Sequence, residues 1–509
     1  METKTAAIEM RNITKRFGPV LANDKVWLNI YRGEILALLG ENGSGKTTLM
    51  NMLSGIYFPD EGEIKIDGKE VVIRSPKDAF DNGIGMIHQH FKLVDVLTAA
   101  ENIVLGLPGK LDLKAASAKI REICDKYGFS VDPAQKIYDM SVSQKQTVEI
   151  VKVLYRGADI LILDEPTAVL TPQETDKLFA VLRNMRNDGK ASVIITHKMH
   201  EVEALSDRVA ILRHGQFLGD MLTAHTNAQE MTNMMVGHAV SLNIERPDPV
   251  DPKPRIEVKG LTVRSVDGIV KLDNVSFTAN SGEILGIAGI SGCGQKELLE
   301  AIAGLQTVES GSISYIEDDG SREELIGKDP LSIAELGVSL SFVPEDRLGM
   351  GLVGNMNLAD NMMLRSFRRG KSIFTDRRSP RALAESVVQE LSVSTPSVDT
   401  PVRRLSGGNV QKVLVGREIA SAPTVLLTAY AVRGLDIHSS YTIYDLINRQ
   451  KKAGVAVIFV GEDLDVLLEL CDRILVLCGG KVSGIVSGRG AEKREVGMMM
   501  TKLGGQSHE

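Results

Sequence analysis

The sequence has few aromatic residues and few cysteines, and it contains no long apolar run. Aromatic residues make up 4% of the chain, with a single Trp, which argues against a protein that binds RNA or single-stranded DNA by stacking on the bases. The four cysteines form no CxxC pair, so we interpret them as ordinary thiols of a reducing compartment. No stretch reaches the roughly 18–20 consecutive apolar residues of a spanning helix. The first residues also lack the apolar core of a secretory signal. These absences predict a soluble cytoplasmic protein.

The chain also lacks an excess of positive charge. Its 59 Lys and Arg residues face 66 Asp and Glu residues, a formal net charge of −7. That balance gives no general attraction for nucleic acid or for an anionic membrane surface. The 509 residues exceed the roughly 100–200 of one domain, so we expect two or three domains.

The sequence repeats itself once. Residues 32–40 match residues 281–289 at an offset of 249, and residues 207–208 match residues 472–473 at an offset of 265. An offset that grows once along the chain indicates a duplicated domain with an insertion in the second copy.

The repeat sets the expected domain boundaries. Between the copies, four prolines fall within residues 244–254, which is typical of a stiff, extended and solvated linker. We therefore predict domains at 1–243 and 255–505, with a tail at 506–509. Short apolar runs alternate with helical patterns in each copy, which predicts an α/β fold with a buried, mostly parallel sheet. Residues 97–157 are mostly helical in pattern and predict an inserted helical subdomain.

A phosphate-binding motif stands near the start of the first copy. Residues 40–47 fit GxxxxGK[ST] between an apolar run and a helical pattern, which is the context of a P-loop. Its glycines let the backbone wrap around phosphate oxygens, Lys46 would neutralise the β- and γ-phosphates, and the Thr47 hydroxyl would bind Mg²⁺. The predicted ATP-binding residues of this loop are Gly40, Glu41, Asn42, Gly43, Ser44, Gly45, Lys46, Thr47 and Thr48.

A second motif ends the apolar run at residues 160–163. Two carboxylates, Asp164 and Glu165, follow it directly. Carboxylates at the end of a buried strand are costly unless they meet a cation or water. We predict Asp164 as a metal partner and Glu165 as the general base for the attacking water.

With these residues in place, the sequence resembles the ATP-binding-cassette (ABC) ATPases over nearly all of both copies. The resemblance implies two tandem P-loop domains, each with a mostly parallel core sheet, an antiparallel β part and an inserted helical subdomain. It implies that Phe17 stacks on adenine. Gln89 would contact the metal near the transport subunits, and His197 would contact the γ-phosphate. The implied catalytic residues are then Glu165, His197 and Gln89, with Thr47, Gln89 and Asp164 at the metal.

The second copy has lost these groups. Gln295 and Lys296 stand where the P-loop has lysine and threonine, and Ala429 and Tyr430 stand where Asp164 and Glu165 would be. Glu345 and Glu462 replace the glutamine and the histidine.

The signature segments show the opposite pattern. The family's LSGGQ-type signature is nearly intact at residues 405–409 and degraded at residues 140–144. Since paired cassettes of this family place a P-loop against the partner's signature, the intact parts combine into one complete site. The predicted contacts from the second copy are Ser406, Gly407, Gly408, Asn409 and Asp436. We expect one hydrolytic site per chain, with the other kept for packing or for binding nucleotide without turnover.

The overall plan resembles the double-cassette ATPases of bacterial importers for ribose-type sugars and for nucleosides. The segments PEDR at 344–347 and RGLD at 433–436 carry this resemblance, and residues 88–94 are closer to the nucleoside group. It implies ATP and Mg²⁺ as cofactors. It also implies membrane permease subunits and a solute receptor as partners, no nucleic acid, and a peripheral place on the cytoplasmic face of the bacterial membrane. The alternative is a soluble twin-cassette protein that acts on ribosomes.

Overall fold

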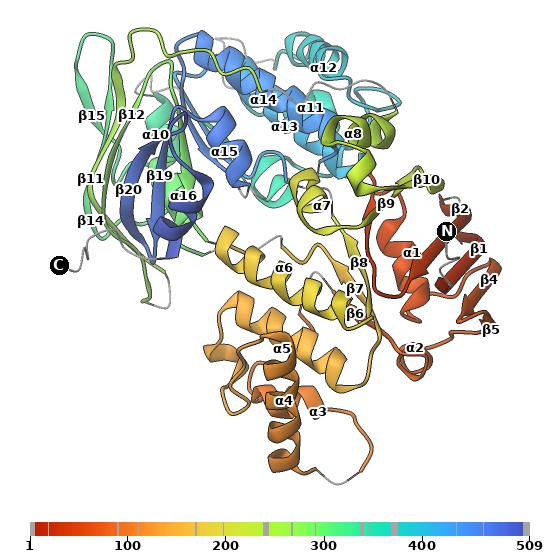
Figure 1. The fold of residues 1–509 in the computed structure, drawn as a ribbon. Helices are drawn as coiled ribbons and strands as arrows, with labels where there is room; N and C mark the ends of the chain where they lie inside the picture. The colour runs from red at the N-terminus through yellow and green to blue at the C-terminus, as the bar shows by residue number, and fades with distance from the viewer. Residues whose placement is uncertain are drawn as a thin grey trace. The chain divides into compact units, whose positions relative to one another are not determined.

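The computed structural model describes residues 6–18, 20–88, 91–109, 111–167, 170–196, 198–237, 244–265, 268–290, 292–335, 340–344, 346–367, 375–433, 435–461 and 463–501. The chain forms two compact units, Met1–Ser241 and Leu242–Glu509 (Figure 1). None of the helices in the described ranges is both long and apolar enough to cross a membrane.

The first unit contains two sheets and eight α-helices within its described residues. Its strands are β1 (Ala6–Phe17), β2 (Val20–Tyr31), β3 (Ile35–Leu39), β4 (Glu61–Ile66), β5 (Lys69–Val71), β6 (Ile84–Ile87), β7 (Ile160–Asp164), β8 (Ala191–Ile195), β9 (Arg208–Arg213) and β10 (Gln216–Leu222). Its helices are α1 (Lys46–Leu53), α2 (Pro76–Asp81), α3 (Ala99–Val104), α4 (Leu113–Tyr127), α5 (Val142–Tyr155), α6 (Pro172–Asn187), α7 (Met199–Leu205) and α8 (Ala228–Val236).

The larger sheet of this unit positions the predicted site. Its strand order is β10-β9-β3-β8-β7-β6, with β3, β6, β7, β8 and β9 parallel and β10 antiparallel at the edge. The second sheet, β2-β1-β4-β5, is antiparallel. In parallel sheets, ligands bind beyond the carboxyl ends of the strands. The loops after β3, β7 and β8 therefore meet at the edge where the predicted phosphate and carboxylate groups stand.

The central strands are apolar because helices cover both faces of the sheet. All five residues of β7 are buried, and the first four alternate between two cores. Ile162 packs in one core with Leu49 of α1, and Leu161 packs in the other with Leu182 of α6. This burial on both faces explains why β7 carries no polar residue before Asp164.

The predicted helical subdomain is present as α3, α4 and α5, which lie together in Figure 1. A separate core joins them, including Ile103, Ile120 and Val148. The side chain of Thr98 caps α3 in a capping box with Glu101.

The second unit repeats this plan. Its strands are β11 (Pro254–Arg264), β12 (Val270–Asn280), β13 (Ile284–Ala288), β14 (Ser310–Ile316), β15 (Arg322–Glu324), β16 (Leu340–Val343), β17 (Val425–Ala429), β18 (Ala456–Val460), β19 (Arg473–Cys478) and β20 (Lys481–Ser487). Its helices are α9 (Gln295–Ile302), α10 (Pro330–Glu335), α11 (Leu358–Met363), α12 (Arg378–Glu390), α13 (Gly407–Ala420), α14 (Ile437–Lys452), α15 (Leu464–Leu470) and α16 (Lys493–Thr501).

The strand order and the register confirm the duplication. The large sheet runs β16-β17-β18-β13-β19-β20, which is the first unit's order read from the other end. Ile35 pairs with Ser192 in the first unit, and Ile284 pairs with Val457 in the second. These two pairs differ by 249 and 265 residues, the offsets of the sequence repeat. The predicted α/β fold class is therefore confirmed.

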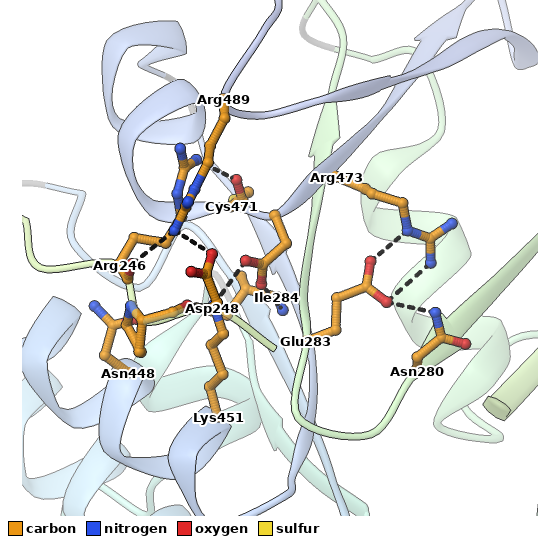
Figure 2. A network of polar contacts seen from close by, with 12 residues as sticks. Arg246, Asp248, Asn280, Glu283, Ile284, Asn448, Lys451, Cys471, Arg473 and Arg489 are labelled. Atoms are coloured by element: carbon orange, nitrogen blue, oxygen red, sulfur yellow. Dashed lines mark hydrogen bonds and ion pairs between the residues drawn. The ribbon is translucent and has the colours of Figure 1, made fainter. Parts of the chain in front are cut away.

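The predicted linker is only partly solvated. Figure 2 shows Arg246 donating to the backbone of Cys471, and the same guanidinium donates to the Leu468 carbonyl, at 2.6 and 2.7 Å. Asn448 donates to the Glu245 carbonyl at 2.6 Å. Arg246 satisfies carbonyls at the carboxyl end of α15 that the helix itself leaves unpaired. The prediction of a solvated spacer is thus wrong for this first part, which is attached to the second unit. Residues 250–253 are exposed.

Ion pairs hold the same segment in place. Asp248 pairs with Arg489 (Figure 2). Lys451 donates to the Pro247 carbonyl. Lys451 also pairs with Asp472 at 2.7 Å and is 2% exposed. A lysine buried this deeply has to be paired, and the linker supplies part of that pairing.

Candidate functional site

The P-loop of the first unit connects the buried strand β3 to α1. Gly43 and Gly45 have φ angles of 81° and 96°, in the left-handed region that glycine adopts without strain. A Cβ atom on Gly45 would lie 2.3 Å from the Ala22 carbonyl oxygen. The loop therefore needs glycine at this position both for its backbone conformation and for the close approach of β2.

Lys46 lies inside the loop at the start of α1. It is 7% exposed, and its Nζ donates to the carbonyls of Gly40 and Glu41 at 2.7 and 2.9 Å. Burial lowers the pKa of Lys46, and the negative charges of Glu165 and Asp164 oppose that shift. A cation held among backbone carbonyls at a helix start is suited to bind phosphate oxygens.

Asp164 and Thr47 bring the two motifs together. The Thr47 hydroxyl donates to Asp164 Oδ2 at 3.2 Å. Burial raises the pKa of Asp164, and the neighbouring Glu165 carboxylate raises it further. The two groups form a small set of hard oxygen donors that fits Mg²⁺, whose charge would offset the burial of the carboxylate.

Glu165 stands on a turn that few residues other than glycine adopt. Its φ is 46°, and its backbone N–H donates to the Ile195 carbonyl at 3.0 Å. Such a conformation persists where the surrounding structure enforces it, and it is common at functional sites. The turn directs the chain out of the sheet immediately after β7, beside the P-loop.

The buried hydroxyl of Ser44 supports a phosphate at this site. Ser44 is 4% exposed, and its Oγ has no hydrogen-bond partner among the described residues. An unpaired buried hydroxyl is costly, and a phosphate oxygen in the loop would pair with it. Among the other predicted loop residues, Asn42 and Thr47 are exposed, and Thr48 is half-buried on α1.

Phe17 lies at the end of β1 and is 41% exposed. Tyr57 packs edge-on against it at 5.1 Å between ring centroids, and the Lys15 ammonium lies 5.5 Å from its ring. The sequence analysis missed Tyr57 and Lys15. Lys15 lies in β1, and Tyr57 lies in the segment that leads into β4, the strand that pairs with β1 in the antiparallel sheet. No motif in the sequence marks this pairing.

Two predicted catalytic residues, Gln89 and His197, lie outside the described residues. So do Glu345 and Glu462, their equivalents in the second copy. Their roles stay predictions.

The second unit keeps the shape of a P-loop without its charge. Gly292 and Gly294 have φ angles of 86° and 99°, close to those of Gly43 and Gly45. Gln295 donates to the Ile290 carbonyl at 3.2 Å, as Lys46 does to its own loop.

The described substituted positions of the second unit differ from their first-unit counterparts in charge and in contacts. Lys296 is directed to an ion pair with Glu300 at 3.8 Å. Tyr430 occupies the same left-handed turn as Glu165, with a φ of 52°, and follows the buried Ala429.

The intact signature begins α13. The Ser406 hydroxyl accepts from the Asn409 N–H at 3.4 Å, and Ser406 and Gly407 are exposed. The exposed start of this 14-residue helix presents backbone N–H groups that can face an anion. Asp436 caps α14 through the Ser439 N–H at 2.7 Å.

The degraded signature keeps its helix cap but not its glycines. Ser141 caps α5 and accepts from the Gln144 N–H at 3.3 Å. Side chains at Val142 and Ser143 now occupy the places of the two glycines. Thr171 caps α6 in the place of Asp436.

Arg347 is a further residue that the sequence analysis did not single out by itself. Its guanidinium donates to the Gly407 carbonyl at 3.3 Å and to the Arg433 carbonyl. It therefore ties the PEDR segment to both the signature and the RGLD segment of the same unit. The arginine at the end of PEDR was the available signal.

Comparison with known proteins places these observations in a family. The family described as "ABC transporter" matches residues 23–168 and 272–428. "Nucleoside import ATP-binding protein NupA" of Lactococcus lactis subsp. cremoris is 42% identical, with 99% of each chain covered. "Glucose import ATP-binding protein TsgD13" of Haloferax volcanii is 39% identical, covering 98% of this chain and 96% of its own. "Guanosine import ATP-binding protein NupO" of Bacillus subtilis is 40% identical, covering 97% of both.

Proposed function

The chain belongs to the ABC transporter family and is an ATPase, and from that premise we propose that it is the energy-coupling subunit of an importer for nucleosides or simple sugars. The resemblance to double-cassette ATPases is confirmed. The observation that carries the proposal is the contrast between the two P-loops: Lys46, Asp164 and Glu165 surround the first, and the second keeps only its backbone shape.

In the proposed hydrolysis, side chains of the first unit bind the phosphates and activate the attacking water. Lys46 neutralises charge on the β- and γ-phosphates, and the loop N–H groups hold their oxygens. Thr47 and Asp164 would hold Mg²⁺, which when bound draws negative charge from the phosphates. Glu165 accepts the proton of the attacking water. By resemblance, Gln89 and His197 complete the metal and γ-phosphate contacts.

In this proposal the second unit supplies the surface that closes over the bound nucleotide. Ser406, Gly407 and Gly408 at the exposed start of α13 would close over the γ-phosphate bound at the first P-loop, with Asn409 and Asp436 holding the shape of that surface. One complete ATP site and one degenerate site per chain follow from this arrangement.

We propose membrane permease subunits, and through them a solute receptor, as the partners on the cytoplasmic face of the membrane. Large apolar side chains are exposed on and beside the helical subdomain of the first unit, with Val96 at 67%, Leu111 at 69% and Tyr138 at 60%. Exposed apolar side chains that adjoin one another form surfaces that bind other proteins, and the proposal assigns these side chains to such a surface.

Nucleosides are the favoured solute class in this proposal. The relatives at 42% and 40% identity are named for nucleoside or guanosine import, and those at 39% and 38% identity are named for glucose and ribose import. The ribosome-acting alternative finds no support among these relatives.

Uptake measurements test the proposal in cells that lack the chain's gene and are complemented with variants. Wild-type protein should restore uptake of a labelled nucleoside, and Lys46→Ala should abolish it. Gln295→Ala, the matched change in the degenerate loop, should leave uptake largely intact. Restored uptake of labelled ribose or glucose alone would assign the sugar class. No change in the uptake of any of these solutes would refute the importer assignment.

A further inference from the structure

Four polar residues form a buried cluster behind the catalytic strand ends of the first unit. The Thr167 hydroxyl donates to Glu201 Oε1 at 2.5 Å, and the Thr196 hydroxyl donates to Glu201 Oε2 at 3.3 Å. Lys198 Nζ lies 3.3 Å from Glu201 Oε1 and donates to the Thr167 carbonyl at 3.3 Å. The two threonines and the glutamate are 3–4% exposed. Both oxygens of the glutamate are thus paired, and a cation balances its charge.

The cluster joins the two loops that follow β7 and β8. Thr167 is two residues beyond Glu165, and Thr196 directly follows β8. Glu201 comes from the first turn of α7 and contacts both loops at once. The Lys198 N–H donates to the Thr196 hydroxyl at 3.1 Å, so the chain is held on both sides of position 197. Glu201 is therefore a bridge between the loop of the proposed base and the loop that the resemblance assigns to the γ-phosphate contact.

The second unit has the same backbone without this cluster. α15 aligns residue for residue with α7, and the Tyr430 N–H donates to the Val460 carbonyl as the Glu165 N–H does to Ile195. The equivalents of the four cluster residues at the offset of 265 are Val432, Gly461, Asp463 and Val466. The two valines pack against the hydrophobic core. The fold of a cassette thus forms with apolar residues at these positions, and the buried carboxylate is not required for it.

Another ion pair differs from the Glu201 cluster because it is present in both copies. Glu34 pairs with Arg208 at 2.8 Å in the first unit, and Glu283 pairs with Arg473 at the equivalent place in the second (Figure 2). A pair found in both the complete and the degenerate unit serves the fold that they share. The Glu201 cluster is found only where the catalytic residues are, although a buried polar group is costlier than an apolar one unless it is fully paired.

We propose that Glu201, with Thr167 and Thr196, is a positioning group that fixes the loops after β7 and β8 relative to one another for ATP hydrolysis. The proposal rests on the ATPase activity and is independent of the transported solute. Because placement errors of about 1 Å in a catalytic group can lower a rate about a hundredfold, loosening this bridge should act on turnover more than on ATP binding.

The test compares two substitutions at Thr167 by kcat and KM for ATP in the purified full chain. Thr167→Val removes the hydroxyl, keeps the shape, and reproduces the residue of the second unit. It should lower kcat by roughly ten- to a hundredfold while KM changes by less than about threefold. Thr167→Ser keeps the hydroxyl and should restore most of the rate. Glu201→Val should lower kcat at least as much as Thr167→Val does.

Glu34→Gln is the control for loss of stability, because it weakens the first unit's copy of an ion pair that each unit contains. It should lower the unfolding midpoint and leave kcat per folded molecule unchanged. A wild-type kcat in Thr167→Val would overturn the proposal. Equal decreases in kcat in Thr167→Val and Thr167→Ser would overturn it as well. So would equal decreases in kcat in Thr167→Val and the Glu34→Gln control. If Glu201→Val does not fold, the Thr167 pair decides the question. Wild-type turnover, measured first, tests the ATPase assignment separately.

Discussion

Replacing Glu165 by Gln should separate ATP binding from ATP hydrolysis in this protein. The substitution keeps the size of the side chain and leaves the left-handed turn with its hydrogen bond to the Ile195 carbonyl in place, since that bond comes from the backbone. It removes the only function that we assign to the carboxylate, acceptance of a proton from water. A positioned general base contributes a factor of about 10²–10⁴, or roughly 2.7–5.5 kcal/mol of activation free energy, and kcat should fall by that amount.

Binding should respond differently because the substitution removes one negative charge beside the loop that binds the phosphates. Glu165 raises the pKa of Asp164, so its loss makes Asp164 easier to ionise and easier to pair with a metal. We therefore expect the affinity for ATP to be equal to or greater than that of the wild type.

Phosphate release gives kcat for this variant, and equilibrium binding of a fluorescent ATP analogue gives the affinity. Tyr430→Phe is the matched control at the equivalent turn of the second unit, and it should retain the wild-type rate. Hydrolysis by Glu165→Gln within twofold of the wild type would refute the assignment of the base.

Two further substitutions test other parts of the account. Burial raises the pKa of Asp164 in the folded state above its value in the unfolded state, so ionisation of Asp164 destabilises the unliganded fold at neutral pH. This destabilisation disappears as the pH falls below the unfolded-state pKa. Asp164→Asn should therefore raise the unfolding midpoint at pH 7 and abolish hydrolysis. The difference in unfolding midpoint between this variant and the wild type should narrow toward pH 4. Thermal melts at several pH values measure that difference, and a difference that does not depend on pH would contradict the prediction. Arg246→Ala leaves two carbonyls at the end of α15 without their donor and should destabilise the second unit by about 1–3 kcal/mol in urea unfolding. The control Arg449→Ala removes an exposed ion pair and should lower the free energy of unfolding by less than about 1 kcal/mol. Equal effects of the two substitutions would contradict the attachment of the linker to α15.

The sequence predicted the fold well because strong periodic signals and a repeat constrain it. The strand β7 is apolar up to Asp164, and its equivalent β17 is buried over its whole length, although Ala429 and Tyr430 stand there in place of the two carboxylates. The glycines of the P-loop could be understood from the sequence, since the structure shows a left-handed backbone at Gly43 and Gly45 that favours this residue type.

The linker shows what composition alone misses. Its prolines predict extension, which is a local property, but Arg246 attaches it to helix ends more than 200 residues away in the sequence. The Glu201 cluster was missed for a related reason. Threonines and a glutamate in separate segments have no spacing that identifies them, and only the packing of α7 against two strand ends brings them together.

The central claim is that one ATP site per chain combines the first P-loop with the second signature. Gly408 and Ser143 occupy equivalent signature positions, and a Cβ atom on Gly408 would meet its nearest neighbour at an ordinary 3.6 Å, so a side chain there is compatible with the fold. The most direct measurement is the ATPase rate of Gly408→Asp beside that of Ser143→Asp. We predict that Gly408→Asp abolishes hydrolysis by placing a negative charge against the γ-phosphate and that Ser143→Asp retains the wild-type rate. Loss of activity in Ser143→Asp with normal hydrolysis in Gly408→Asp would contradict the account.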